Sequence, residues 1–189
     1  MEKEKVLAII DGSNLYHKLK DLEIQSTGKF DYRGLIGWLA RDRKVVSVTY
    51  YVGAVRTKRS DKKGQQLRKG QQKLFSHLGS QDQGIEVKTG YIMKTDGKYH
   101  EKGVDVHMAV DLLIGAYEDL YDTALIVSSD TDLIPAIQKV RQRKKKIEYI
   151  GFSHAPSLGL QKHANISRLL IKEEIEKFST SQPDLPKQP

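Results

Sequence analysis

Short apolar or β-branched runs alternate along the chain with longer segments whose apolar positions repeat at helical spacing. Several of the short runs carry apolar side chains on both alternating faces, which is typical of central strands covered on two sides. Strands and helices in regular alternation predict an α/β fold, with a mostly parallel sheet and helices on both of its faces. The runs predicted as strands are residues 6–10, 45–55, 85–92, 123–129 and 146–152.

Helices are predicted between the strands and after the last of them. Pro135 marks the start of one helix, because a proline is tolerated in the first turn, where its missing N–H has no partner. Residues 166–178 are predicted to form a closing helix. Residues 179–189 hold three of the five prolines and little that is apolar, so we expect a disordered tail behind one domain, residues 1–178. The other predicted helices are residues 14–22, 33–42, 65–78, 104–120 and 133–143.

Composition restricts the classes of function that the chain can have. The 189 residues, 38% of them hydrophobic, suffice for one soluble domain with a sizeable core. A formal net charge of +8 makes a polyanion such as nucleic acid a natural partner. The absence of cysteine excludes thiol catalysis and zinc sites with thiolate ligands. No apolar run approaches the roughly 18 residues of a membrane span, so we expect a cytoplasmic protein that makes no membrane contact.

Acidic residues stand at the ends of two predicted strands. Asp11 ends the first strand and is followed by a glycine turn, with Asn14 at the opening of the next helix. Asp130 and Asp132 follow the fourth strand in the stretch SSDTD. The carboxyl ends of parallel strands form the ligand crevice of an open sheet. These carboxylates should therefore meet at one edge if their strands are neighbours.

A third acidic position is Asp105, which lies in the first turn of a strongly apolar predicted helix. Asp111 lies about 240° around that helix from Asp105, so it is the weaker candidate. Clustered carboxylates repel each other unless a cation lies between them, and oxygen ligands favour Mg²⁺ or Mn²⁺ over zinc or copper. The residues that are candidates to complete or orient such a metal shell are Asn14, Ser128 and Thr131.

Each acidic residue also has an ordinary structural explanation. Asp11 suits a turn, Asp105 complements a helix dipole, and Asp132 suits a helix cap. Taken together, however, the aspartates favour a site. A metal ion bound there polarises a phosphate and lowers the pKa of a bound water, which is the chemistry of phosphodiester hydrolysis.

Three motifs in order along the chain, IIDGSNLY, KGVDVHMAVDLL and LIVSSDTDLIPAI, resemble the NYN domains of the LabA-like group, within the PIN-like nuclease superfamily. The resemblance covers about residues 5 to 172. It implies a three-layer α/β/α sandwich with a mostly parallel central sheet, a carboxylate pocket that binds Mg²⁺ or Mn²⁺, and cleavage of RNA. The catalytic residues that it implies are Asp11, Asn14, Asp105, Asp130 and Asp132, and the four aspartates among them are the implied metal ligands.

Two departures from the family pattern stand out. PIN-like proteins often carry a further glutamate on an early helix, and the nearest candidate in this chain is Glu23. Many relatives have glycine before the aspartate that corresponds to Asp130. This chain has Ser129 there, which adds a side chain at a tight turn.

A basic run at residues 56–73 follows the second predicted strand, so its start should lie on the same sheet edge as the carboxylates. We expect a flexible basic loop there that contacts the phosphate backbone of RNA. A second basic run, residues 141–146, ends a helix at the opposite edge, where cations complement the helix dipole. The residues predicted to bind substrate are Arg56, Lys58, Arg59, Lys62, Lys63 and Lys102.

The aromatic residues present no evident platform for base stacking, because Tyr50, Tyr51 and Tyr149 fall in predicted strands and should lie in the core. RNA binding should therefore be led by phosphate contacts and depend steeply on salt.

A metal-dependent ribonuclease that acts on single-stranded RNA is the function that these features favour. The alternative is a regulatory module of the same fold that binds RNA and cleaves it slowly or not at all. Phosphatases of other α/β classes fit poorly, because DGSN lacks the second aspartate of a DxD motif and Leu15 interrupts a DxSxS motif. A homo-oligomer is compatible with the sequence, which identifies no protein partner.

Overall fold

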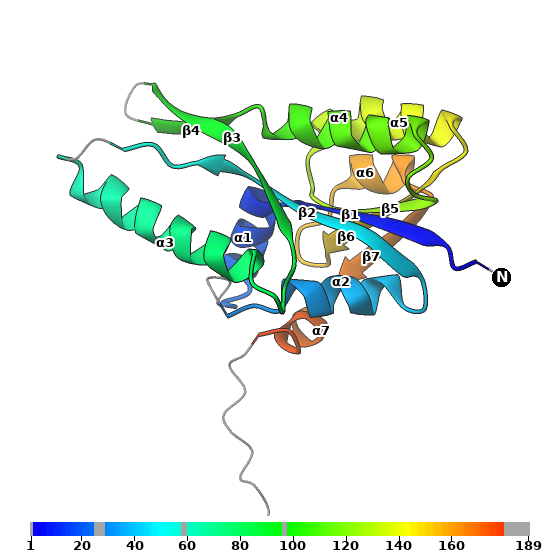
Figure 1. The fold of residues 1–189 in the computed structure, drawn as a ribbon, viewed down its shortest axis with the longest axis horizontal. Coiled ribbons are helices and arrows are strands. Elements are labelled where there is room, and N and C mark those ends of the chain that lie inside the picture. The colour runs from blue at the N-terminus through cyan, green and yellow to red at the C-terminus, as the bar shows by residue number, and fades with distance from the viewer. Residues whose placement is uncertain (1, 25–28, 58–59, 96–97, 180–189) are drawn as a thin grey trace, which may run out of the picture.

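The computed structural model describes residues 2–24, 29–57, 60–95 and 98–179, and for residues 93–95 and 98–101 it describes the backbone alone. A seven-stranded sheet runs through the molecule in the order β4-β3-β2-β1-β5-β6-β7 (Figure 1). All neighbouring strands are parallel except β4, which pairs antiparallel with β3 at one edge. The strands are β1 (Lys5–Asp11), β2 (Lys44–Ala54), β3 (Glu86–Thr95), β4 (Lys98–Lys102), β5 (Thr123–Val127), β6 (Lys146–Phe152) and β7 (Ile166–Leu170).

Helices cover both faces of this sheet and enclose two apolar cores, which confirms the predicted α/β/α sandwich (Figure 1). The helices of one face are α1 (Gly12–Asp21), α2 (Tyr32–Ala40), α3 (Lys62–Leu78) and α7 (Lys172–Glu176). Those of the other face are α4 (Val104–Tyr117), α5 (Ile134–Gln142) and α6 (Leu158–His163), and the short 3-10 helix η1 (Thr131–Leu133) precedes α5. Within the described ranges, no helix has the length and apolarity that a membrane span requires.

The central strand β1 shows why the apolar runs were correctly predicted as strands. Ala8 and Ile10 point into one core and Ile9 into the other, and all three side chains are fully buried. A strand between two helical layers needs apolar side chains on both faces, which removes the polar alternation of a half-exposed strand. Tyr50, Tyr51 and Tyr149 are buried, as predicted.

The predicted closing helix over residues 166–178 is wrong. Residues Ile166–Leu170 form β7, which pairs in parallel with β6 at the edge of the sheet, and the helix that follows is only the short α7. A run of five or six residues does not distinguish a strand from a helix by periodicity, and pairing with a distant strand decides the outcome here. Of the predicted tail, Ser179 forms an isolated bridge with Phe30, and residues 180–189 lie outside the described residues.

Two further elements differ from the sequence prediction. Strand β4 was not predicted, and it forms a hairpin with β3. Helix α3 begins at Lys62, earlier than predicted, because Asp61 accepts a hydrogen bond from the backbone N–H of Gly64 and caps the helix. Pro135 lies in the first turn of α5, as predicted.

Arg43 ties the end of α2 to β6, and its removal provides a test of how the layers are held together. Its guanidinium donates hydrogen bonds to Glu148 Oε1 at 2.6 Å and Oε2 at 3.1 Å, and to the carbonyl oxygen of Ala40 at 2.9 Å. The bonds to Glu148 raise the pKa of Arg43.

We expect Arg43→Ala to lower the free energy of unfolding by about 1–3 kcal/mol, because it leaves a partly buried carboxylate without its charged donor. Urea unfolding measures this change. Arg33→Ala, at an exposed position on α2, is the control and should change stability by less than about 0.5 kcal/mol. Equal losses for the two variants would show that the link between Arg43 and Glu148 does not stabilise the fold.

Candidate functional site

The first part of the candidate site lies where the neighbouring strands β1 and β5 end. Their register pairs Ile10 with Val127, so Asp11 and Ser128 emerge side by side. Asp11 is 6% exposed, and its Oδ2 accepts a hydrogen bond of 2.9 Å from the hydroxyl of Ser128. The same hydroxyl oxygen accepts a bond of 3.1 Å from the backbone N–H of Asp130. One buried serine therefore joins the carboxylate of β1 to the SSDTD loop.

Both Asp11 and Asp130 also cap helices. Asp11 Oδ1 accepts from the backbone N–H of Asn14 at 2.9 Å at the start of α1. Asp130 Oδ1 accepts from the backbone N–H of Asp132 at 2.8 Å at the start of η1. The structural explanation of Asp132 as the cap is therefore wrong, because η1 precedes α5 and moves the cap to Asp130. Asp132 itself is exposed.

Asp105 is partly buried in the first turn of α4. Lys102 at the end of β4 pairs with Tyr91 of β3, which pairs with Ala54 at the end of β2. Helix α4 therefore starts at the sheet edge where the parallel strands end. Gly103, with φ +83°, forms the tight turn that leads into this helix. Asp105 thus shares this edge with Asp11 and Asp130.

Asp111, the weaker site candidate in the sequence analysis, makes its hydrogen bonds in another part of the fold. It accepts hydrogen bonds from the hydroxyl of Tyr51 at 2.6 Å and from Lys88 Nζ at 2.7 Å. Burial raises the pKa of Tyr51, and its hydrogen bond to Asp111 raises that pKa further. Asp111 thus links α4 to β2 and β3.

The donor set at this edge matches what a hard divalent ion requires. Asp11, Asp130 and Ser128 supply only oxygen atoms, which Mg²⁺ and Mn²⁺ prefer. Within the described ranges, however, no three acidic or histidine side chains gather as a metal-binding group. The four aspartates therefore do not form one closed cluster. Mg²⁺ commonly keeps several waters and takes only one or two protein carboxylates, so the pair Asp11 and Asp130 suits it.

The serine that replaces the family's glycine has an unusual environment. Ser129 Oγ is a buried polar atom with no hydrogen-bond partner among the residues that the structure describes. Such atoms are rare in folded proteins and are costly without a partner. Ser129 lies between Ser128 and Asp130, so this hydroxyl is part of the same loop.

The early-helix glutamate of the PIN-like pattern does not reach this edge. Helix α1 is 10 residues long, so it spans roughly 15 Å away from Asp11. Glu23 is exposed beyond its far end.

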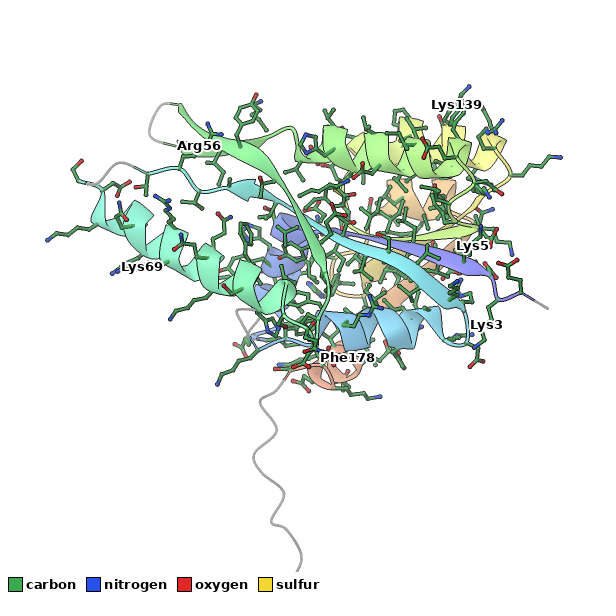
Figure 2. The ribbon with its side chains drawn as sticks, viewed as in Figure 1. Lys3, Lys5, Arg56, Lys69, Lys139 and Phe178 are labelled. Atoms are coloured by element: carbon green, nitrogen blue, oxygen red, sulfur yellow. The ribbon has the colours of Figure 1, made fainter. Side chains whose placement is uncertain are left out.

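The first basic run lies at the carboxylate edge but is mostly helix. Arg56 is exposed just beyond β2, and Lys62 and Lys63 are exposed in the first turn of α3. Lys102 is exposed before α4, whereas Lys58 and Arg59 lie outside the described residues. The predicted flexible loop is therefore shorter than expected. Figure 2 shows Arg56 and Lys69 at the same end of the molecule.

Gln71 holds α3 against the end of β2, and no sequence signal predicted this. Its Nε2 donates to the carbonyl oxygen of Gly53 at 2.7 Å, and its Oε1 accepts from the backbone N–H of Val55 at 2.8 Å. The partners are separated from Gln71 by 16 and 18 positions, beyond any local pattern.

The second basic run has the structural role expected of it. Arg141, the first residue of the run, lies in the last turn of α5 together with Lys139, where both complement the helix dipole. Lys145 forms an ion pair with Asp119, and Lys146 opens β6 at the opposite edge of the sheet.

Comparisons with known proteins agree with this architecture. The family model of the NYN domain matches residues 5–170. The chain is 41% identical over 69 residues to an uncharacterized protein of Methanocaldococcus jannaschii, a match that spans 36% of this chain and 28% of that protein. In fold it is similar to the crystal structure of a protein of unknown function from Vibrio parahaemolyticus, with a TM-score of 0.62 and 24% identity over 89% of this chain and 94% of that one.

The adjacent serines 128 and 129 offer a matched pair of variants. We expect Ser128→Ala to lower the free energy of unfolding by about 1–3 kcal/mol, because Asp11 loses a donor and the N–H of Asp130 loses its acceptor. Ser129→Ala should leave stability unchanged or raise it slightly, because it removes a buried polar atom for which the described residues offer no partner. Thermal unfolding of both variants measures the difference, and a larger loss for Ser129→Ala would contradict this assignment of hydrogen bonds.

Proposed function

Because the chain belongs to the NYN domain family, a PIN-like nuclease family, we propose that it is a metal-dependent ribonuclease that hydrolyses RNA phosphodiester bonds where β1 and β5 end. The observation that carries the proposal is the link from Asp11 through the hydroxyl of Ser128 to Asp130. It joins the carboxylate of Asp11 to the backbone of Asp130 at one edge of the sheet. The order of the three motifs supports membership of the LabA-like group within the family.

In this proposal Asp11 and Asp130 hold Mg²⁺ or Mn²⁺, which when bound supplies a water of lowered pKa and polarises the scissile phosphate. Each carboxylate has one oxygen held by a backbone N–H, so its orientation is set before any ion binds. Asp105 and Asp132 contribute further negative charge from α4 and η1. Asn14, in the first turn of α1 close after Asp11, completes or orients the shell of the metal ion.

The substrate strand is held by exposed cations at the same edge. Arg56, Lys62, Lys63 and Lys102 are exposed around the ends of β2 and β4 and the start of α3, and Lys58 and Arg59 continue this run in the sequence. Lys145 and Lys146, by contrast, form ion pairs with acidic side chains at the opposite edge. This contrast supports binding of a phosphate backbone at the carboxylate edge.

A second candidate function is an RNA-binding module of the same fold that does not cleave. It is favoured by one observation: in the described part of the chain, no three acidic or histidine side chains gather as a metal-binding group. RNA binding without metal-dependent turnover would support this candidate.

The nuclease proposal predicts loss of cleavage when either of the two linked carboxylates loses its charge. Asp11→Asn and Asp130→Asn each keep the oxygen that caps a helix. We expect each to reduce cleavage of end-labelled single-stranded RNA in Mg²⁺ or Mn²⁺ by about a hundredfold or more, because metal-ion catalysis is worth several kcal/mol. EDTA should abolish cleavage by the parent protein.

The control for this assay is Asp42→Asn, at an exposed position before β2, which should cleave like the parent. Cleavage that persists in EDTA, or that survives both Asp11→Asn and Asp130→Asn, would exclude the proposed mechanism. No cleavage by the parent, with RNA binding intact, would leave the binding module as the function.

The cationic edge predicts the salt dependence of RNA binding. Arg56→Gln combined with Lys63→Gln should make the slope of log affinity against log salt concentration shallower by about 0.7 for each phosphate that the protein no longer neutralises. Fluorescence anisotropy of labelled single-stranded RNA at several salt concentrations measures the slope. The control is Lys3→Gln combined with Lys139→Gln, at positions far from Arg56 and Lys69 in Figure 2. Equal changes for the two double variants would show that binding is not localised at this edge.

A further inference from the structure

Helix α3 stands away from the sheet. Of its 17 residues only Gly64 and Leu78, near its two ends, are buried, and Leu67 is 49% exposed. A pocket of about 650 Å³ therefore opens between α3, α1 and β2. This volume falls within the range of sites for small ligands. The side chains that give the pocket its apolar character include Tyr16, Tyr50, Leu67, Leu74 and Ile92.

The pocket is lined by residues that directly follow Asp11 of the candidate site. Gly12 and Ser13, which directly follow Asp11, form part of its wall. Tyr50 is buried beneath them, and its hydroxyl donates a hydrogen bond of 3.2 Å to the carbonyl oxygen of Gly12. A ligand in the pocket would therefore lie against the first turn of α1, which directly follows Asp11 in the chain.

The chemistry of the wall suits a flat, neutral ring that is joined to a negatively charged group. Tyr16 is 46% exposed and meets His17 edge-to-face, with ring centroids 5.5 Å apart, so its ring is held while part of it stays accessible. Gln66 offers a carboxamide and Lys63 an ammonium group on the α3 side. Among the residues that the structure describes, no aspartate or glutamate lines the pocket.

We propose that this pocket binds one unpaired nucleotide of the RNA strand whose neighbouring phosphate lies at Asp11. The proposal rests on the proposed ribonuclease function, which it deepens by naming the place where an unpaired base of the single-stranded substrate binds. An unpaired base can leave its neighbours and stack on an aromatic side chain, whereas a base in a duplex cannot enter a pocket. The sequence indicated no stacking platform, because Tyr16 becomes part of one only through the position of α3.

Gly70 provides a way to fill the pocket without disturbing the fold. It lines the pocket from the middle of α3, and a Cβ atom added there would meet nothing within 4 Å beyond its chain neighbours and the adjacent helix backbone, so there is open space for the start of a side chain. Leucine is also a far better helix former than glycine, so Gly70→Leu should not lower the thermal stability. Gly37→Leu is the matched control, because Gly37 is an exposed helical glycine on α2 with the same open surroundings.

The experiment measures binding of a fluorescently labelled single-stranded RNA by anisotropy. EDTA is present, so that no metal-dependent cleavage takes place. We expect Gly70→Leu to weaken binding about tenfold, the scale of one stacked base, and Gly37→Leu to bind like the parent. A set of strands with a single abasic nucleotide at successive positions gives a second readout. One position should weaken binding to the parent about tenfold and have no effect on Gly70→Leu.

The outcomes distinguish failure of the pocket proposal from failure of the nuclease proposal. If Gly70→Leu binds like the parent, or if no abasic position matters, the pocket proposal is overturned even where the parent cleaves RNA. If Gly70→Leu weakens binding and removes the abasic effect while the parent never cleaves, the pocket is supported and the nuclease proposal fails. If the parent binds no single-stranded RNA, both are overturned.

Discussion

Parallel pairing of β1 with both β2 and β5 is the constraint on which the candidate site depends. It buries β1 between two helical layers and brings the ends of neighbouring strands to one edge of the sheet. The Asp11 carboxylate is then almost fully buried, which is costly unless its oxygens are hydrogen-bonded. The N–H of Asn14 and the hydroxyl of Ser128 meet that requirement from two different strand ends.

Capping and metal binding do not exclude each other at these aspartates. A carboxylate has two oxygens with about four lone-pair sites, and a helix cap uses one of these sites. In Asp130 the capping oxygen is Oδ1, which holds the carboxylate in a fixed orientation at the start of η1. The hydrogen bond that caps the helix therefore orients the side chain before any ligand binds. A sequence pattern alone cannot distinguish a capping aspartate from a ligand-binding one.

The sequence predicted the elements whose apolar pattern is long or repeated, and failed where distant contacts decide. Strand β1 and helix α4 follow from their own residues. Strand β7 does not, because its short run becomes a strand only by pairing with β6. Within the site, the rule for parallel sheets predicted that Asp11 and the pair Asp130 and Asp132 would meet at one edge, whereas Asp105 was a candidate from its place in the first turn of a helix. The cap lies at Asp130 rather than Asp132 because η1 comes before α5. No sequence pattern predicted this short 3-10 helix.

The position of α3 is the clearest case of structure that local sequence does not encode. The side chain of Gln71 forms hydrogen bonds with the backbone of Gly53 and Val55, on either side of Ala54 at the end of β2. These are the bonds that a neighbouring strand would make, and they hold α3 at the strand end. Closing the helix onto the sheet would bury Leu67 and gain about 25 cal/mol for each Å² of apolar surface removed from water. The chain leaves that surface open beside its buried carboxylate instead. Exposed apolar surface at a concave site is typical of a binding surface rather than of a core, which argues that ligand contact, and not stability, accounts for the spacing of α3.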